Sequence, residues 1–384
     1  MLLSLKRKWL LVILNLLIVP LLFSFPARAE FASTAEAAVL MEFTSGNILY
    51  EKNATVAKAP ASITKLMTLL LAYEAVEEGR VNWDTPVTVS EKAWRMGGSQ
   101  MFLEVGDEVS FKELVTGISV VSANDACVAV AEHLTGSEAA FVEAMNTRAR
   151  EIGLQQSSFK NATGLPAEGH VMSCLDIAVL SRYLIENFPQ ILEFESQREF
   201  TYNDIKQYNR NPLLGRYSGA DGLKTGWTEE AGYCLSATAE RDGMRLIAVI
   251  LNTNSEKERL AAAEEILDYG FLNYQLHEAV AAGEIIQEVP VTNGRQLSVP
   301  VKAAAKVEVP LKKTKLGDLE RVVVVEEAKA PIAEGETLGK LEIKLAGKVV
   351  GETELVAAED VGKANIFVRL FRWLLGLIKI KPAA

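Results

Sequence analysis

The pattern of apolar and polar positions close to the N-terminal end of the chain predicts a strand hairpin. Residues 37–43 are apolar except for one glutamate, residues 44–47 carry the turn chemistry Thr-Ser-Gly-Asn, and residues 48–50 resume an apolar run. Both runs are short enough to be strands, so they predict the first hairpin of an antiparallel sheet.

The next segments have the length and period of helices. Residues 62–73 are apolar nearly all round, which predicts a central buried helix that ends at Gly79. A mostly helical region is expected from about residue 90 to about residue 190. Its predicted helices span residues 111–121, 125–134, 138–151 and 174–187.

Strands return after this helical region. Residues 233–240 and 244–251 flank Arg241-Asp242-Gly243, a hairpin turn. Residues 255–274 follow as an amphipathic helix that is long enough to cover one face of a sheet. Strands at both ends with helices inserted between them predict an α+β body, in which an antiparallel sheet flanked by helices contains both the first and the last segments.

From about residue 280 the chain becomes β-rich. Short apolar runs alternate with turn signals such as Asn293-Gly294 and Gly347, which predicts a separate small all-β domain. This region carries no catalytic constellation, so we expect a spacer or a binding platform. Its predicted strands span residues 285–291, 296–301, 321–326, 340–345 and 348–355.

The first 29 residues have the composition of a secretory signal peptide. The basic segment Lys6-Arg7-Lys8 precedes an apolar stretch over residues 9–25, and Ala27-Arg28-Ala29 is a small-x-small cleavage site. We expect the mature chain to begin at Glu30 and to be secreted. An uncleaved anchor with the same orientation is the alternative.

The C-terminal segment, residues 365–381, predicts an amphipathic helix. At about 100° per residue its polar or small positions share a wedge of roughly 80°, and apolar residues fill the remainder. A transmembrane span needs about 20 apolar residues, and two arginines interrupt this shorter stretch. We therefore expect residues 362–384 to anchor the protein on the membrane surface; packing against the protein's own core is the alternative. The positions in the wedge are Asn365, Arg369, Arg372, Gly376 and Lys379.

Composition narrows the classes of partner and cofactor. The 384 residues carry a formal net charge of −10, and phosphate binding needs clustered positive charge, so nucleic acid is not an expected partner. Cys127, Cys174 and Cys234 are widely spaced among apolar neighbours, which favours buried thiols over a disulfide. The three histidines are not at ligand spacing from the cysteines, so we expect neither a metal site nor a cofactor.

Ser62 and Lys65 are the first candidates for catalysis. They lie three residues apart at the start of the apolar helix, and positions i and i+3 share a helix face. A serine becomes a good nucleophile when a neighbouring base removes its proton, and burial or nearby positive charge lowers the pKa of a lysine toward that of such a base. The spacing alone is a weak signal, because residues 157–160 repeat it in a polar stretch that we interpret as a loop.

Two further motifs follow in order. Ser122-Ala123-Asn124 falls between two predicted helices, where a short loop can present side chains to a cleft. Ser45-Gly46-Asn47 has the same pattern but belongs to the hairpin turn. Lys224-Thr225-Gly226 occurs once and leads into strand residues. The three motifs in this order form a strong signal, although each is weak alone.

The order and spacing of these motifs resemble the penicillin-recognising serine enzymes, and most closely the low-molecular-mass penicillin-binding proteins that act as D-alanyl-D-alanine carboxypeptidases. The resemblance covers residues 35–275, including residues 161–165 (Asn-Ala-Thr-Gly-Leu) and 209–211 (Asn-Arg-Asn), and extends in layout to the β-rich domain and the tail. It implies a β-lactamase/transpeptidase-like fold. The expected domains are a signal peptide (1–29), a catalytic domain (30–277), a β-rich domain (278–361) and an anchor helix (362–384).

The resemblance also implies catalytic roles. Ser62 would be acylated and Lys65 would be its base. Ser122 would pass the proton toward the nitrogen of the leaving D-alanine. The oxyanion hole would use the backbone N–H groups of Ser62 and Trp227, donors aimed at charge that appears only in the transition state.

The remaining matching residues would bind the substrate. Asn124 would hold the substrate amide, and Lys224 and Thr225 would bind the terminal carboxylate. Arg210 is a further candidate for the carboxylate. Gly226 would let the strand backbone approach the substrate, and the bulk of Trp227 would narrow the cleft.

The implied activity is that of a serine-type carboxypeptidase that removes the terminal D-alanine from peptidoglycan stem pentapeptides and is inhibited by β-lactam antibiotics. A β-lactamase is one alternative, but class A members activate water with a glutamate, and residues 161–185 contain no Glu-x-x-Leu-Asn. The other alternative is a penicillin sensor or scaffold that is acylated without turnover. In the polar loop after Pro166 we expect Glu168 and His170 to shape the cleft rim.

Overall fold

The computed structural model describes residues 31–314, 319–325 and 327–370. Its first part is built on a six-stranded antiparallel sheet in the order β2-β1-β10-β9-β7, with β8 also paired with β9. Ala37 of β1 pairs with Leu251 of β10, so the first and last segments share one sheet and the predicted α+β class is confirmed. The strands are β1 (Ala37–Glu42), β2 (Ile48–Lys52), β7 (Ala220–Gly222), β8 (Thr225–Thr228), β9 (Gly232–Arg241) and β10 (Met244–Thr253).

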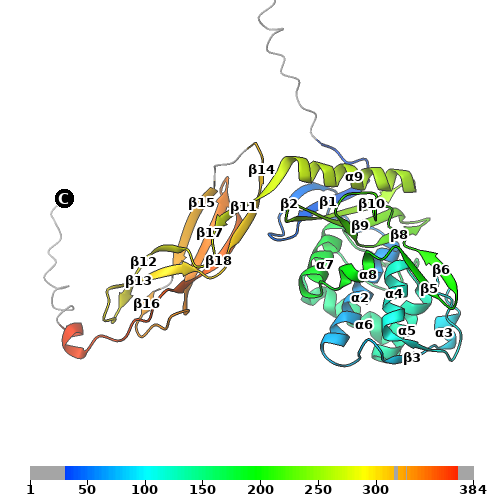
Figure 1. Cartoon of the computed structure of the whole chain (residues 1–384), viewed down its shortest axis with the longest axis horizontal. Coiled ribbons are helices and arrows are strands. Elements are labelled where there is room, and N and C mark those ends of the chain that lie inside the picture. Colours follow the sequence, from blue (N-terminus) through cyan, green and yellow to red (C-terminus); the bar gives the residue numbers. More distant parts are fainter. Residues whose placement is uncertain (1–30, 315–318, 326, 371–384) are drawn as a thin grey trace, which may run out of the picture. The chain divides into compact units, whose positions relative to one another are not determined.

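Helices cover both faces of this sheet (Figure 1). The helix α9 (Glu256–Asn273) lies along one face and is capped by Ser255, whose side chain accepts a hydrogen bond from the Glu258 N–H at 3.1 Å. The helix α7 (Cys174–Asn187) packs against β1 and β10 from the other side. All residues of β1 are buried, which explains its continuous apolar run, since a strand covered on both faces has no solvent side.

The segment between β2 and β7 folds as a helical layer around α2 (Lys65–Glu77), whose buried residues leave no solvent-facing stripe over most of its length. The predicted helix does not begin as an α-helix: residues 61–64 form a 3₁₀ turn, η1 (Ala61–Thr64). Gly79 follows the end of α2 with φ +70°, a left-handed conformation that suits glycine. The other helices are α3 (Glu91–Trp94), α4 (Phe111–Val120), α5 (Asn124–Thr135), α6 (Glu138–Glu151) and α8 (Ile191–Glu195).

Two short antiparallel strand pairs in the helical layer are absent from the sequence prediction. They are β3 (Pro86–Thr88) with β4 (Glu108–Ser110), and β5 (Glu199–Tyr202) with β6 (Ile205–Tyr208). Strands of three or four residues are too short to show a reliable alternation of apolar and polar positions, so periodicity could not identify them.

The β-rich part has its own hydrophobic core, and its main sheet has the order β15-β17-β18-β13-β12-β16. The five predicted strands are present, whereas β11, β14 and β16 were not predicted. The strand β11 begins at Tyr274. The domain boundary that we placed between residues 277 and 278 stays a prediction. The strands are β11 (Tyr274–Val280), β12 (Ile285–Thr292), β13 (Ser298–Ala303), β14 (Val307–Lys312), β15 (Leu319–Val325), β16 (Ala328–Lys329), β17 (Thr337–Leu345) and β18 (Lys348–Ala357).

The two ends of the chain are described only in part. The predicted signal peptide lies outside the described residues, and so does the tail beyond residue 370. Residues 366–370 are helical, and the Asn365 side chain caps them by accepting a hydrogen bond from the Val368 N–H at 2.9 Å. Within the described part of the chain, no helix combines the length and apolar character that crossing a membrane requires.

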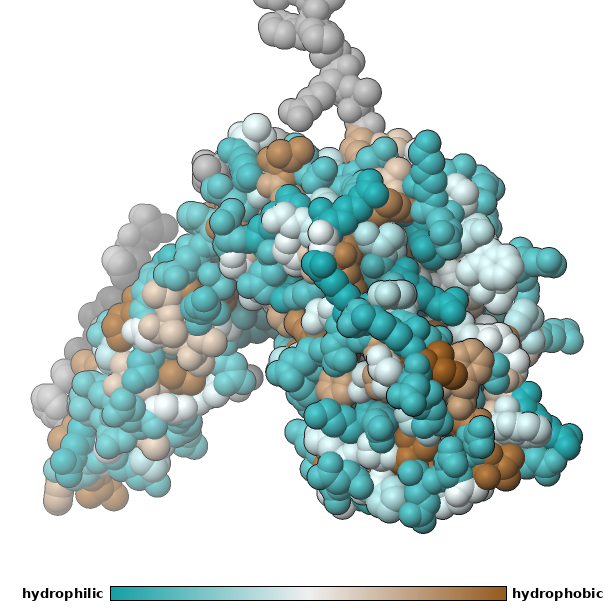
Figure 2. Space-filling model, turned by 45° about the vertical axis from the view of Figure 1, so that its right-hand side comes forward, coloured by the Kyte–Doolittle hydropathy of each residue, from teal (hydrophilic) through white to brown (hydrophobic). Residues whose placement is uncertain are grey.

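The surface and the thiols match ordinary expectations for a folded protein. Cys127, Cys174 and Cys234 are buried and free, as predicted. On the face shown in Figure 2, apolar residues form small areas separated by hydrophilic ones. Exposed apolar side chains that occur singly are normal on soluble domains.

Candidate active site

The Ser62 hydroxyl lies on the 3₁₀ turn that precedes α2. Ala61, directly before it, has φ +48°, a conformation that non-glycine residues adopt rarely. Ser62 Oγ lies 2.9 Å from Lys65 Nζ. The turn therefore holds the hydroxyl at hydrogen-bond distance from a candidate base, which is the geometry that nucleophile activation requires.

Lys65 is fully buried and its Nζ contacts three acceptors. Besides Ser62 Oγ, these are Asn124 Oδ1 at 2.8 Å and the Thr163 carbonyl oxygen at 2.6 Å. Burial, together with the positive charges of Lys224 and Arg210, lowers the pKa of Lys65 to about 7. A neutral amine has two N–H groups and one lone pair. Asn124 and Thr163 can accept the two N–H groups, which leaves the lone pair for the Ser62 hydroxyl proton.

The Thr163 carbonyl is held in place by the loop of residues 161–165. Asn161 Oδ1 accepts hydrogen bonds from the Thr163 N–H (3.1 Å), the Thr163 hydroxyl (2.9 Å) and the Gly164 N–H (2.7 Å). Gly164 has φ +84°, and a Cβ there would lie 1.9 Å from the Ala61 carbonyl oxygen, so only glycine fits between the loop and the serine turn.

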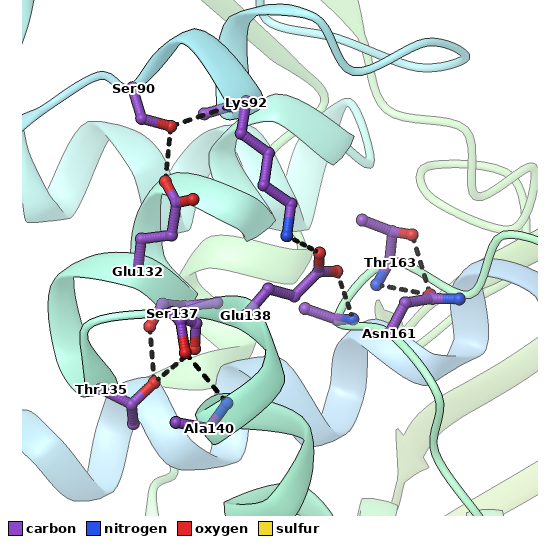
Figure 3. Close-up of polar contacts among 12 residues, drawn as sticks. Ser90, Lys92, Glu132, Thr135, Ser137, Glu138, Ala140, Asn161 and Thr163 are labelled. Carbon is purple, nitrogen blue, oxygen red and sulfur yellow. Dashed lines mark hydrogen bonds and ion pairs between the residues drawn. The ribbon is translucent and has the colours of Figure 1, made fainter.

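A second contact ties this loop to the helical layer (Figure 3). Glu138, at the start of α6, accepts a hydrogen bond from the Ala162 N–H at 3.1 Å and forms an ion pair with Lys92 of α3 at 2.7 Å. The Lys65 acceptor is thus supported from two sides, by Asn161 within the loop and by Glu138 outside it.

Ser122 and Asn124 lie at the turn between α4 and α5. Ser122 has φ +64° and is buried, and its Oγ has no hydrogen-bond partner. A strained, unpartnered hydroxyl beside a cleft is typical of functional sites. The Asn124 amide is engaged at both ends, because Oδ1 accepts from Lys65 and Nδ2 donates to the Gly97 carbonyl at 2.7 Å.

The third motif forms the edge strand β8. Gly226 pairs with Cys234 of β9, and a Cβ on Gly226 would lie 2.8 Å from the Pro60 carbonyl oxygen and 3.2 Å from the Ser62 nitrogen. The absence of a side chain therefore lets β8 approach the serine turn. Lys224, just before β8, is buried, and burial lowers its pKa.

These elements surround one open cleft of about 1510 Å³. Lys65 and Lys224 are buried and do not form part of its lining, although Lys65 contacts Ser62. The structure thus brings together the residues of all three motifs. The predicted site residues that line the cleft are Ser62, Ser122, Asn124, Arg210, Thr225, Gly226 and Trp227.

His170 is not where the sequence analysis placed it. We predicted it at the cleft rim with Glu168, but its ring is buried, and Nε2 lies 2.8 Å from Thr64 Oγ1 while Nδ1 accepts from the Lys160 N–H at 3.3 Å. The rim prediction is wrong for His170, because the chain turns it inward behind the serine turn. Leu165 and Pro166 line the cleft instead.

Sequence reasoning missed two buried charged groups near the cleft. Arg259 of α9 lines the cleft, and its guanidinium lies 5.7 Å from the centre of the Tyr233 ring. Glu195, at the end of α8, is fully buried near Lys224. Neither belongs to a motif, and a charged residue in a polar sequence stretch gives no signal of burial.

Comparison with known proteins gives matches over nearly the whole chain. The family described as D-alanyl-D-alanine carboxypeptidase matches residues 25–255, and the family described as the C-terminal domain of penicillin-binding protein 5 matches residues 274–363. The D-alanyl-D-alanine carboxypeptidase DacF of Bacillus subtilis (strain 168) is 39% identical over 360 residues, which is 92% of each chain.

Solved structures agree with these matches. Penicillin-binding protein 5 from Haemophilus influenzae has a TM-score of 0.80 at 34% identity, and the match covers 87% of this chain and 99% of that one. Penicillin-binding protein D2 from Listeria monocytogenes, solved in an ampicillin-bound form, has a TM-score of 0.58 at 34% identity over 63% of this chain and 99% of that one.

Proposed function

The chain belongs to the D-alanyl-D-alanine carboxypeptidase family, and from this premise we propose that it removes the terminal D-alanine from peptidoglycan stem pentapeptides through an acyl-enzyme on Ser62. The observation that carries the proposal is the contact between Ser62 Oγ and a buried Lys65 amine whose other two partners are both acceptors. That arrangement makes the lysine a base for the serine hydroxyl at neutral pH.

In the first step, Lys65 takes the Ser62 proton while Oγ attacks the carbonyl carbon between the two terminal D-alanines. The resulting oxyanion accepts hydrogen bonds from the Ser62 and Trp227 N–H groups. The close approach of Gly226, the residue before Trp227, to the Ser62 nitrogen supports this pair of donors. The proton then passes by way of the Ser122 hydroxyl to the departing nitrogen. The carbon–nitrogen bond breaks, and D-alanine leaves with its amine neutral.

The terminal carboxylate of the substrate is bound by cations on one side of the cleft. Lys224 and Arg210 supply positive charge, and the Thr225 hydroxyl supplies a donor. The buried position of Lys224 strengthens its attraction for an anion, because less solvent screens the charge. Asn124 keeps Lys65 in place and adds a polar group beside the substrate amide.

Water then hydrolyses the acyl-enzyme. The acidic residues that line the cleft are Glu229, Glu230 and Glu256, which come from the end of β8 and the start of α9. The loop of residues 161–165, which approaches the serine turn, contributes no carboxylate. This favours slow hydrolysis of a penicilloyl-enzyme over rapid β-lactamase turnover.

We expect the purified protein to release D-alanine from a peptide that ends in D-Ala-D-Ala and to form a long-lived adduct with benzylpenicillin. Intact-protein mass spectrometry checks the adduct, and a D-alanine assay checks the release. A peptide that ends in L-alanine is the control. Rapid loss of the adduct without D-alanine release would indicate a β-lactamase, and a stable adduct without release would indicate a sensor or scaffold.

We also propose that the protein is secreted and binds the outer face of the cytoplasmic membrane through its C-terminal helix. The capped turn at residues 365–370 supports this proposal. Ile366 and Phe367 are 72% and 79% exposed, which is unusual for large apolar side chains at the start of a helix.

Deletion of the chain from Asn365 onward is expected to move the protein from the membrane fraction to the soluble fraction and leave D-alanine release intact. The physical reason is the loss of the apolar helix face that would enter the interface. Sedimentation with anionic lipid vesicles provides the measurement, and Phe367→Asp in the full chain is the matched variant. Equal binding by the truncated chain would rule out the anchor.

A further inference from the structure

A buried carboxylate lies behind the cleft without a hydrogen-bond partner. Glu195 ends the short helix α8 with no exposed surface, and neither Oε1 nor Oε2 has a partner. Burying a carboxylate without partners is costly. Its oxygens bind no backbone group of α8, so any group that balances its charge has to come from outside the helix.

The surroundings of Glu195 relate it to Lys224. The Glu195 side chain lies close to Gly222: a Cβ added to Gly222 would lie 3.6 Å from the Glu195 Cβ. Gly222 precedes Lys224 by two residues. Ser119 of α4 and Tyr73 of α2 face the carboxylate. Neither hydroxyl reaches hydrogen-bond geometry, but the Ser119 hydroxyl is near enough to lower the pKa of Glu195, against the larger effect of burial. On α8 itself, Glu193 is exposed.

Lys224 has both positive and negative groups around it, with Lys65 among the positive ones. Arg210 and Arg259 both lower its pKa, as does burial, which is the largest cause. Glu195 is the strongest influence that raises the pKa of Lys224, ahead of the Cys127 thiol on α5. The two charges act on each other through the protein interior, where Coulomb interactions are stronger than in water.

We propose that Glu195 is a positioning residue for the carboxylate-binding site: it is the internal counter-charge that keeps Lys224 an ammonium in the free enzyme, and it takes up a proton when the substrate carboxylate supplies a negative charge in its place. The inference rests on the proposed function of the cleft. Burial raises the pKa of Glu195, so the resting pair can give up its first proton from Glu195 and leave Lys224 charged.

The sign of the expected pH dependence follows from this pairing. Carboxylate binding needs the Lys224 ammonium and is lost as the pH rises through its pKa. Without the negative charge of Glu195, that pKa falls further. The alkaline limb of kcat/KM for D-alanine release should therefore move to lower pH in Glu195→Gln, by about one unit, which is about a tenfold loss on that limb.

The kinetic test compares three variants. In Glu195→Gln, KM is expected to rise about tenfold at the alkaline end, with kcat and the acid limb little changed. Glu195→Asp should restore most of the loss, because it keeps the charge, and Glu193→Gln should behave as the wild type. A Glu195→Gln profile that matches the wild type would overturn the proposal, and so would equal loss in Glu195→Gln and Glu195→Asp with intact circular dichroism.

A second measurement does not depend on turnover. Infrared difference titration of the resting wild-type enzyme should show a protonated carboxyl C=O band that disappears above neutral pH and is missing in Glu195→Gln and present in Glu193→Gln. A band that persists in the wild type at alkaline pH would refute the buried counter-charge even if D-alanine is released, because a carboxyl that stays protonated supplies no negative charge. A band that appears neither in the free enzyme nor on binding of a carboxylate ligand would refute the proton uptake. If the band is present and shifts on binding of a carboxylate ligand but no D-alanine is released, the proposed function fails while this pairing stands.

Discussion

Ser62→Ala is expected to abolish both D-alanine release and covalent labelling by a fluorescent penicillin, with kcat/KM reduced at least about 10⁴-fold. The substitution removes the hydroxyl that forms the acyl bond, and the oxyanion donors alone cannot replace it. The other hydroxyl of this turn, on Thr64, is buried and lies 2.8 Å from His170 Nε2. Gel fluorescence and intact mass after exposure to penicillin measure the adduct directly.

The second Ser-x-x-Lys copy provides a matched control for this experiment. Ser157 lies in a loop, where its hydroxyl donates to Asp176 at 2.7 Å, away from the cleft. Ser157→Ala should label and turn over like the wild type. Labelling that persists in Ser62→Ala at the wild-type rate would place the nucleophile elsewhere.

Lys65→Gln is expected to slow acylation about 10³-fold and to remove its dependence on pH near neutrality. In the wild type, the second-order rate of acylation should rise as the pH increases through about 7, because Lys65 must be neutral to take the serine proton and its pKa lies near that value. Stopped-flow measurement of penicillin acylation from about pH 5 to about pH 9, about two units on either side of that pKa, records both effects.

Lys160→Gln is the control for the lysine, since Lys160 occupies the same position in the loop copy of the motif. It should leave the rate and its pH profile unchanged. If Lys65→Gln keeps the wild-type rise with pH, another group titrates in this range and Lys65 is not the base.

The candidate site residues could be identified from the sequence because the chemistry proposed for them is carried by short, local motifs. The spacing of Ser62 and Lys65 on one helical turn, and the turn position of Ser122, follow from local geometry alone. Helices with clear periods were also predictable: α6 and α7 have the predicted bounds, residues 138–151 and 174–187.

The supporting contacts could not be predicted, because they join segments that are distant in sequence. The Thr163 carbonyl contacts Lys65 from 98 positions away, and nothing in residues 161–165 indicates where the chain will place them. His170 and Glu195 were missed for a related reason, since both are polar residues that tertiary packing buries. The pattern of apolar and polar residues within a helix or strand predicts which of its faces is buried. It does not predict which polar side chains the rest of the chain will bury.

The pairing of β1 with β10 determines what an incomplete chain can do. Ala37 and Leu251 become neighbours in the sheet although all the candidate site residues lie between them in sequence. The sheet therefore closes through contacts of long sequence separation, which form slowly. A chain that stops before Met244 contains Ser62, Lys65, Ser122 and Lys224 yet leaves one edge of β1 unpaired and uncovered by α9. A premature stop there produces an aggregation-prone strand edge and not a smaller working enzyme.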